Sequence, residues 1–327
     1  MSATLAPRVV VVSRRSELDE LLARHGTRAA AEHFLRERGR DLDEVTARHE
    51  ALQAALTTVD AAVPADWRRG RVDRDDLPRF LFTPEDVVVA VGQDGLVANL
   101  AKYLAGQPVI GLDPGPGPGP GVLIRFRADS IGTALRSVAR RTAAMRRLTM
   151  VTARLDDGQE LAGLNEVYAG HGTHQSARYR LIEATGRHER QSSSGVLVGT
   201  GTGATGWSAS IAAERGWGEA PPAPEEPSLS WFVREAWPSP ATGTALTAGT
   251  LKAGEELRLV CESERLVVFA DGVESDHLTV TWGQQITIGL ADRHLHLVVP
   301  GSGERGGAPG VPARAARRSR GSGGRRE

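Results

Sequence analysis

The sequence contains little of what several common chemistries require. Only two of its 327 residues are lysines, Lys102 and Lys252, and its 40 basic and 40 acidic side chains cancel. Two lysines leave few routes to Schiff-base chemistry or to a lysine-dependent phosphate loop. A balanced charge gives no overall field that favours nucleic acid or a membrane as the main partner. We therefore expect a small-molecule ligand.

Cysteine and long apolar runs are scarce as well. Cys261 is the only cysteine, so no disulfide framework or thiolate metal site is available, and the apolar run before it predicts a buried position. No apolar run approaches the roughly 20 residues that a membrane helix needs. Residues 1–13 lack the charged-then-apolar pattern of a signal peptide. These absences predict a cytoplasmic protein.

The first part of the chain has the pattern of strands alternating with helices. Residues 9–12 predict a buried strand, and three helices follow, the second capped by Thr27 and the third opened by Asp41 and Glu44 in capping-box spacing. Residues 64–76, rich in Arg and Asp, are expected on the surface. The run VVVAV, a following helix and the run PVIGL predict a strand–helix–strand unit, which indicates a parallel α/β sheet.

The pattern changes after a Pro-Gly repeat. DPGPGPGPG, residues 113–121, is incompatible with a helix or a central strand and predicts a loop or hinge. From Leu148 onward, short alternating runs predict stacked β-sheets with one helix at about residues 205–215. We therefore predict an α/β domain over residues 1–129, a β-rich domain over 130–300 and a disordered Gly/Arg-rich tail over 301–327.

The most informative turn is GQDG, residues 92–95, between a buried strand and a helix. Gly92 and Gly95 let the backbone approach a ligand, and the helix N-terminus presents unpaired N–H groups that suit a phosphate. Asp94 is unexpected there, because it would repel a phosphate unless a metal or a chemical role compensates. It could act as a general base toward an attacking hydroxyl. The alternative is a Gly-Asp-Gly turn in which Asp94 caps the helix.

A second glycine-rich loop, VGTGTGATGWSAS at residues 198–210, has the GxGxxG spacing of a dinucleotide-binding turn. We reject that interpretation, because a Pro-rich loop and antiparallel strand signals follow where a parallel βαβ unit is required. The threonine and serine hydroxyls of the loop remain suited to phosphate or ribose. Trp207 offers either a flat binding surface or plain core packing.

Two shorter motifs complete the pattern. Asn165 and Glu166 interrupt the apolar stretch LAGLNEVYAG, where an amide beside a carboxylate can bind the hydroxyls of a sugar or the edge of a base. A strand-end turn is the alternative. Asp271 and Gly272 end the run VVFADG, which alone indicates an ordinary hairpin.

Together these motifs resemble the NAD kinase family, and the resemblance extends to about residue 299. The family's GGDG motif corresponds to residues 92–95, its Asn-acidic pair to residues 165–166, its Thr-rich loop to residues 200–210 and its late Asp-Gly to residues 271–272. The runs RVVVVSR, LNEVYAG, SSSGVLVGTGTGATGWS and VREAW are similar to those of the mitochondrial-type branch.

The resemblance implies a two-domain kinase, α/β at the N-terminus and β-rich at the C-terminus, of the NAD kinase and diacylglycerol kinase type. With ATP and Mg²⁺ it would phosphorylate the 2′-hydroxyl of the adenosine ribose of NAD to give NADP, as a homodimer or higher homo-oligomer. Asp94 would be the general base. The other implied contacts with phosphates or the dinucleotide would be made by Gly92, Gly95, Asn165, Glu166, Thr202, Gly203, Thr205, Gly206, Trp207 and Ser210.

Two departures from the family motif imply reduced activity. Gln93 replaces a glycine and Leu96 replaces a threonine, and a hydrogen bond lost from a charged phosphate costs about 1.5–3 kcal/mol, or roughly 10- to 150-fold in rate. One alternative function is therefore a catalytically silent nucleotide-binding regulatory homologue. The other is a lipid or sphingoid kinase of the same superfamily, against which Asn165, Glu166 and Trp207 favour a dinucleotide.

Overall fold

A parallel sheet of valine-rich strands forms the centre of the N-terminal domain in the computed structural model, which describes residues 7–115 and 121–301. The strands lie in the order β4, β3, β1, β2, so their carboxyl ends share one edge. The elements are β1 (Arg8–Ser13), α1 (Glu17–His25), α2 (Arg28–Arg36), α3 (Leu42–Ala62), β2 (Arg68–Asp73), η1 (Arg74–Arg79), β3 (Asp86–Val91), α4 (Asp94–Ala101), β4 (Pro108–Asp113), β5 (Phe126–Arg127), η2 (Ala128–Ser130) and α5 (Ile131–Ala139).

Alternation along the valine strands places helices on both faces of this sheet. Val10 of β1 and Val88 of β3 pack with α4 on one face, whereas Val9 and Val89 pack with α3 and α5 on the other. A strand buried on both faces has a continuous apolar sequence, which is why these runs predict buried strands. The predicted strand–helix–strand unit, β3–α4–β4, is confirmed.

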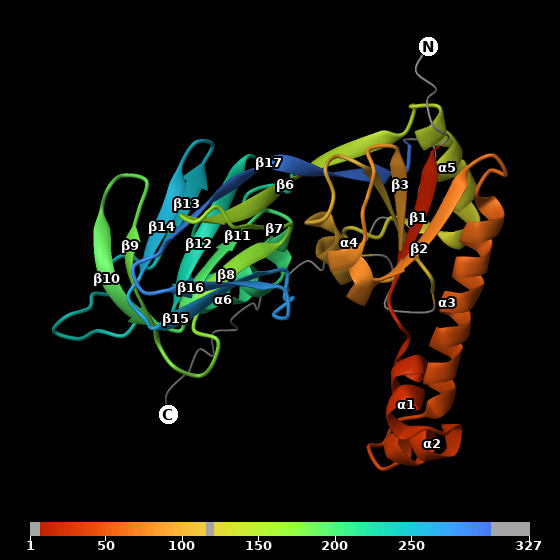
Figure 1. Cartoon of the computed structure of the whole chain (residues 1–327), viewed down its shortest axis with the longest axis horizontal. Helices are drawn as coiled ribbons and strands as arrows, with labels where there is room; N and C mark the ends of the chain where they lie inside the picture. The colour runs from red at the N-terminus through yellow and green to blue at the C-terminus, as the bar shows by residue number, and fades with distance from the viewer. Residues whose placement is uncertain (1–6, 116–120, 302–327) are drawn as a thin grey trace, which may run out of the picture.

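α1, α2 and the start of α3 form a small lobe with its own apolar cluster, away from the β-rich domain (Figure 1). The predicted caps are confirmed: Thr27 accepts a hydrogen bond at the start of α2, and Asp41 does so at the start of α3. No capping box forms with Glu44, because Asp41 accepts from the nearer N–H of Asp43. The capping box instead belongs to α1, where Ser16 pairs with residue 19.

One strand is not predicted by the sequence. Residues 68–73 lie in the segment expected on the surface, yet they form β2, the edge strand that pairs in parallel with β1. Of its side chains only Val72 is buried. An edge strand is held mainly by backbone pairing with one neighbour, so its arginines can stay in solvent and its sequence shows no apolar alternation.

The C-terminal domain consists of two sheets that enclose one apolar core, which confirms the predicted stacked sheets. One sheet has the order β13, β12, β11, β8, β15, β16, and the other contains β10, β9, β14, β17, β6 and β7. The elements are β6 (Ala144–Leu155), β7 (Glu160–Gly163), β8 (Glu166–Gly170), β9 (Ala177–Ile182), β10 (His188–Ser193), β11 (Gly195–Gly199), η3 (Gly203–Thr205), α6 (Trp207–Arg215), β12 (Ser228–Arg234), β13 (Ala248–Lys252), β14 (Glu256–Cys261), β15 (Arg265–Ala270), β16 (His277–Thr281) and β17 (Gln285–Val299).

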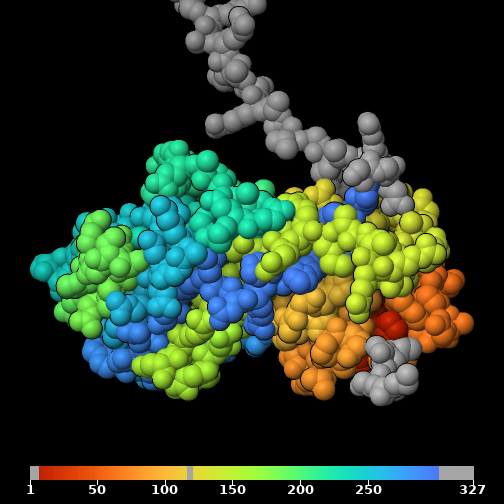
Figure 2. Space-filling view, turned by 90° about the horizontal axis from the view of Figure 1, so that it is seen from above, coloured from red at the N-terminus to blue at the C-terminus, as the bar shows by residue number. Residues whose placement is uncertain are grey.

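The long strand β17 joins the two domains. It pairs with β14 and β6 in the C-terminal domain, and near its end His296 and Leu297 pair in parallel with β4 of the N-terminal sheet. The domains lie side by side, with β6 and β17 running between them (Figures 1 and 2). One continuous hydrogen-bonded sheet therefore extends through both domains.

Three smaller expectations concern single segments. Cys261 is buried at 1% exposure, as predicted, and burial raises the pKa of its thiol. Within the two described ranges, no helix combines the length and the apolar character needed to cross a membrane. Residues 116–120 of the Pro-Gly repeat and all but the first residue of the predicted tail lie outside the described residues.

Candidate functional site

The GQDG turn lies at the carboxyl edge of the parallel sheet. β3 ends at Val91, Gly92 still donates a hydrogen bond to the carbonyl of Leu112 in β4 (3.0 Å), and α4 begins at Asp94. Gln93 is the N-cap residue, and its exposed side chain makes no capping hydrogen bond. The alternative in which Asp94 caps the helix is therefore wrong, because Asp94 is the first helical residue.

The Asp94 carboxylate instead holds the chain that follows the Pro-Gly repeat. Its Oδ2 accepts from the N–H of Val122 (2.6 Å), and its Oδ1 accepts from those of Leu123 (3.0 Å) and Ile124 (2.9 Å). A Cβ on Gly121 would lie 2.2 Å from Asp94 Oδ1, so only glycine fits there. A carboxylate offers about four acceptor positions, and one position on Oδ2 remains open among the described contacts.

A second Asp-Gly turn uses its carboxylate in the same way. Asp271, between β15 and β16, accepts from the N–H groups of Leu164 (2.9 Å), Asn165 (2.7 Å) and Glu166 (3.3 Å). Its φ of 52° is left-handed, a conformation in which Asp is one of the few tolerated side chains. The VVFADG motif is thus more than a hairpin turn, because it fixes the backbone of the Asn165–Glu166 pair.

The two turns are connected through α4. Asn99, one of the few buried polar residues of the N-terminal domain, donates from Nδ2 to the carbonyl of Asp271 (3.0 Å). Asp94 is at the N-terminus of the same helix. The structure therefore links the GQDG turn to the Asn165–Glu166 pair through one short helix and one turn.

The side chains of Asn165 and Glu166 have no hydrogen-bond partner among the described residues. Burial, followed by repulsion from Asp271, raises the pKa of Glu166 to about 7. Burial also raises the pKa of Asp271 to about 6, against the lowering effect of its backbone hydrogen bonds. Perturbed carboxyl groups of this kind are typical of functional sites.

The Thr-rich loop packs against this pair. Thr200 donates from its backbone N–H to the carbonyl of Asn165 (2.9 Å) and from Oγ1 to that of Leu164 (2.6 Å). A Cβ on Gly203 would lie 2.3 Å from the Asn165 carbonyl oxygen. Thr202 is buried, and its hydroxyl has no hydrogen-bond partner in the described chain. The structure thus brings residues 202–203 next to the pair, as a shared site requires.

The start of α6 presents the remaining predicted residues. Thr205, Gly206 and Ser210 are exposed. Trp207 is partly buried, since its ring stacks on Tyr168 at 5.5 Å and lies 5.1 Å from the Arg234 guanidinium. Core packing therefore accounts for part of the Trp207 surface.

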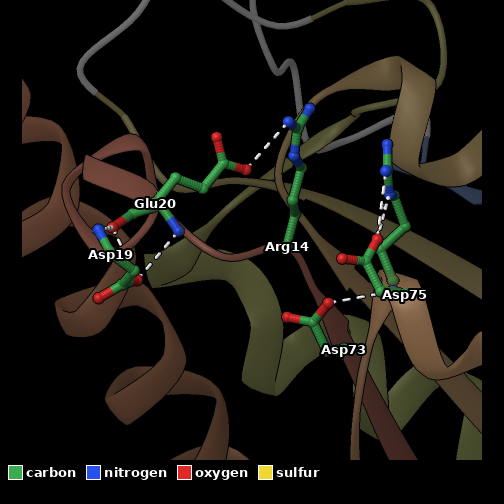
Figure 3. Close-up of polar contacts among 7 residues, drawn as sticks. Arg14, Asp19, Glu20, Asp73 and Asp75 are labelled. Atoms are coloured by element: carbon green, nitrogen blue, oxygen red, sulfur yellow. Dashed lines mark hydrogen bonds and ion pairs between the residues drawn. The ribbon is translucent and has the colours of Figure 1, made fainter. Parts of the chain in front are cut away.

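Charged side chains lie at the carboxyl ends of β1 and β2 (Figure 3). Arg14 pairs with Glu20 at 3.1 Å, and Asp73 accepts from the N–H of Asp75 (3.0 Å) at the start of η1.

A cavity of about 660 Å³ lies beside the Thr-rich loop, between α6, β12 and the chain after α6. None of the predicted site residues lines it, although Thr200, Ala204 and Ser208 do. The Ser208 hydroxyl is buried and has no hydrogen-bond partner within the described ranges.

The described residues do not fit a magnesium site built by the protein alone. They contain no group of three or more His, Cys, Asp or Glu side chains that could hold a metal ion. Asp94 and Asp271 also direct most of their acceptor positions to backbone N–H groups. Mg²⁺ usually binds one or two carboxylates together with substrate phosphates, so here it would come with the nucleotide.

Comparison with solved structures identifies similar folds. Yeast NADH kinase, in a complex with NADH, superposes with a TM-score of 0.58 at 13% identity, over 91% of this chain and 85% of that one. The NAD kinase of Archaeoglobus fulgidus, in a complex with ATP, gives a TM-score of 0.53 at 15% identity, over 89% of this chain and 93% of that one. The chain has the fold of these kinases. No protein-family model matches the sequence. No curated protein matches it either.

The predicted architecture is therefore confirmed, with the α/β and β-rich domains in the arrangement of these kinases. Three groups that hold the site together are not predicted by the sequence: the backbone of residues 122–124, the Asn99 amide and the ion pair of Lys102 with Asp276. A polar Asn99 within the apolar run LVANLAKYL was the available signal.

Proposed function

We propose that the chain is an NAD kinase that transfers the γ-phosphoryl group of ATP to the 2′-hydroxyl of the adenosine ribose of NAD. One observation carries the proposal: a helix of the kinase-like fold connects the Asp94 turn to the Asn165–Glu166 pair, whose side chains have no hydrogen-bond partner in the described part of the chain. The similar structures were solved with NADH and with ATP. The sequence runs shared with the mitochondrial-type branch support a place in that branch.

In the proposed reaction, Asp94 is the general base. It accepts the proton of the 2′-hydroxyl at the open position of Oδ2, while the hydroxyl oxygen bonds to the γ-phosphorus and ADP leaves with the bridging oxygen. Gly92 and Gly95 let phosphates approach the N-terminus of α4. When bound with ATP, Mg²⁺ would neutralise phosphate charge.

The dinucleotide is held by the second half of the site. In this proposal Asn165 and Glu166 bind the adenosine end, and residues 202–203 lie near phosphate. Thr205, Gly206, Trp207 and Ser210 contact the nucleotide from the start of α6. The partly buried hydroxyl and amide groups supply orientation, which is the main catalytic requirement of phosphoryl transfer.

The two departures from the family motif affect this site differently. Gln93 is exposed beside the turn, where its side chain limits the space for phosphate. Leu96 is 6% exposed and belongs to the apolar core next to α4. A threonine at position 96 would lose apolar contacts there, so we expect Gln93→Gly alone, rather than the double change with Leu96→Thr, to raise activity.

The test is NADP formation from NAD and ATP by the wild type and by Asp94→Asn. We expect Asp94→Asn to lower kcat by roughly 10²- to 10⁴-fold. Asp113→Asn is the matched control, because Asp113 ends the neighbouring strand and its Oδ1 accepts a local N–H, that of Gly115 (2.8 Å). Equal activity of Asp94→Asn and wild type would remove Asp94 as the base.

The silent homologue is a second candidate, because three backbone N–H groups already engage Asp94. It predicts NAD binding by calorimetry without any NADP formation. Turnover only with a sphingoid or glycerolipid acceptor would instead identify the lipid-kinase alternative.

We also propose that the chain is a homodimer or higher homo-oligomer. Trp237 and Trp282, both in the C-terminal domain, are 67% and 66% exposed, and tryptophan is enriched in protein interfaces. Light scattering should show at least a dimeric mass, reduced in a Trp237→Ser, Trp282→Ser double variant. A monomeric wild type would contradict this proposal.

A further inference from the structure

The C-terminal end of α4 carries an unusual buried cation. The side chain of Lys102 is 3% exposed, and its Nζ lies 2.5 Å from Oδ2 of Asp276 as an ion pair, without the angle of a well-formed hydrogen bond. Tyr103, the next residue, donates from its hydroxyl to the same Oδ2 (2.7 Å). Asp276 belongs to the turn between β15 and β16, so this contact joins the N-terminal domain to the C-terminal one.

These contacts lie on one face of the helix together with Asn99. α4 ends at Ala101, and Lys102 is its C-cap residue with a helix-like backbone (φ −65°, ψ −18°). Residues 102 and 103 follow Asn99 by three and four positions, the spacing that brings side chains to the same side of a helical turn. Asn99 binds the carbonyl of Asp271, and residues 102 and 103 bind Asp276. The turn over residues 271–276 is thus held at one end by α4 and at the other by the two residues that directly follow it.

The charges make this contact hard to break. Burial alone would raise the pKa of Asp276, but Lys102 and Tyr103 outweigh that effect and lower it. The Lys102 side chain is buried whereas that of Asp276 is 36% exposed, so removal of the carboxylate would leave the buried ammonium group without a partner. The aromatic ring of Tyr103 also lies 5.3 Å from Lys102 Nζ.

The same turn fixes the other half of the site. The Asp271 carboxylate holds the backbone of residues 164–166, while Asp94 lies at the opposite end of α4. A helix of eight residues is about 12 Å long and nearly rigid, so a tilt of about 10° at its C-terminus would move its N-terminus by about 2 Å.

We infer that Lys102, Tyr103 and Asp276 are positioning residues that set the distance from the Asp94 turn to the Asn165–Glu166 pair. The inference rests on the proposed function for its catalytic consequence, since it assumes that both halves of the site contact one substrate. The positioning itself is a property of the fold and can be measured without catalysis.

The experiment compares Lys102→Met, Asp276→Asn and the milder Tyr103→Phe with wild type. Misplacement of catalytic groups by about 1 Å can cost roughly 100-fold in rate, so we expect kcat to fall roughly 10- to 100-fold in the first two variants. KM for ATP, which binds at the N-terminus of α4 in the proposal, should change little. The double variant Lys102→Met, Asp276→Asn should be about as slow as either of these two single variants, because the same ion pair is lost in each of them.

The matched control is Asp86→Asn. Asp86 and Arg8 form an ion pair at 2.6 Å whose carboxylate side is fully buried, but both residues belong to the N-terminal domain. This variant should lower the melting temperature without lowering kcat at 25 °C. If the Lys102 and Asp276 variants behave like Asp86→Asn, their role is only structural and the inference is wrong.

Hydrogen–deuterium exchange separates this inference from the proposed function. In Asp276→Asn and in Tyr103→Phe, amides of residues 164–166 and 122–124 should exchange faster than in wild type, and in Asp86→Asn they should not. Faster exchange in these two variants, together with a wild-type protein that forms no NADP, would support the positioning and refute the kinase. Unchanged exchange at both segments would overturn the positioning whatever the activity.

Discussion

Replacing Glu166 with glutamine should stabilise the protein at alkaline pH and weaken it as an enzyme. The Glu166 carboxyl is raised in pKa from its ordinary value of 4.5 to about 7, first by burial and then by Asp271. Between those two pH values, the unfolded carboxyl has lost its proton and the folded one keeps it. Folding therefore takes up a proton, and stability falls as pH rises through this window. Above pH 7 the full loss of folding stability caused by the charged Glu166 carboxylate is present.

The magnitude follows from the two pKa values. A difference between 4.5 and about 7 corresponds to roughly 3 kcal/mol at pH 8. At pH 5 only the start of the window has been crossed, and the penalty is about 1 kcal/mol. Glutamine has a similar shape and no charge, so Glu166→Gln removes the penalty. We expect the variant to gain roughly 2 kcal/mol more, relative to wild type, at pH 8 than at pH 5.

Urea unfolding at pH 5 and pH 8 measures this effect, from midpoints at equal slope. Glu85→Gln is the control, because Glu85 is exposed at the end of a loop, and surface substitutions usually change stability by less than about 0.5 kcal/mol. The same Glu166→Gln sample should bind NAD more weakly by calorimetry. A variant that is equally stable at both pH values, or less stable at pH 8, would refute the burial of an unpaired Glu166 carboxylate.

Two glycines give further predictions. Gly95 lies in a helix, and the methyl group of Gly95→Ala would meet no atom within 4 Å, so this variant should be more stable by roughly 0.5–1 kcal/mol in thermal unfolding. Its KM for ATP should rise, because the methyl group would block the phosphate. An unchanged KM would contradict a phosphate at this turn. Gly203→Ala should lower the stability of the protein, since its Cβ would lie 2.3 Å from the Asn165 carbonyl oxygen. It should also lower the affinity for NAD measured by calorimetry. NAD binding at wild-type strength would show that residues 203 and 165 do not share a ligand.

The sequence predicts the buried parts of the fold better than its edges. Runs such as VVVAV can only be strands enclosed on both faces, and the structure buries every residue of β3. The sequence does not predict β2, because four of its six residues are Arg or Gly and only Val72 is buried in the core. Its position depends on a neighbouring strand, β1, about 60 residues earlier in the chain, and local sequence cannot report that pairing.

The candidate site shows the same division between local and distant information. Residue types at each turn could be predicted, because Asp, Gly and Asn have local conformational preferences. The hydrogen-bond partner of each side chain could not be predicted. Asp94 binds backbone groups 28 to 30 residues away, and Asn99 binds a carbonyl 172 residues away. Backbone N–H groups are the same in every residue except proline, so a sequence gives no sign of which ones a carboxylate will bind.

Gly121, the last residue of the Pro-Gly repeat, lies against the aspartate of the GQDG turn. The repeat ends at Gly121, where any side chain would collide with the Asp94 carboxylate, and the next three N–H groups bind that carboxylate. Asp271 holds residues 164–166 by the same pattern, two N–H groups on one oxygen and one on the other. In each case the carboxylate oxygen that accepts a single N–H group keeps one open acceptor position. Asp271 lies in the turn between β15 and β16, whereas Asp94 lies at the carboxyl edge of the parallel sheet beside Gly92 and Gly95. Under the proposed function, the open position on Asp94 is therefore the one that would receive the proton of the ribose hydroxyl.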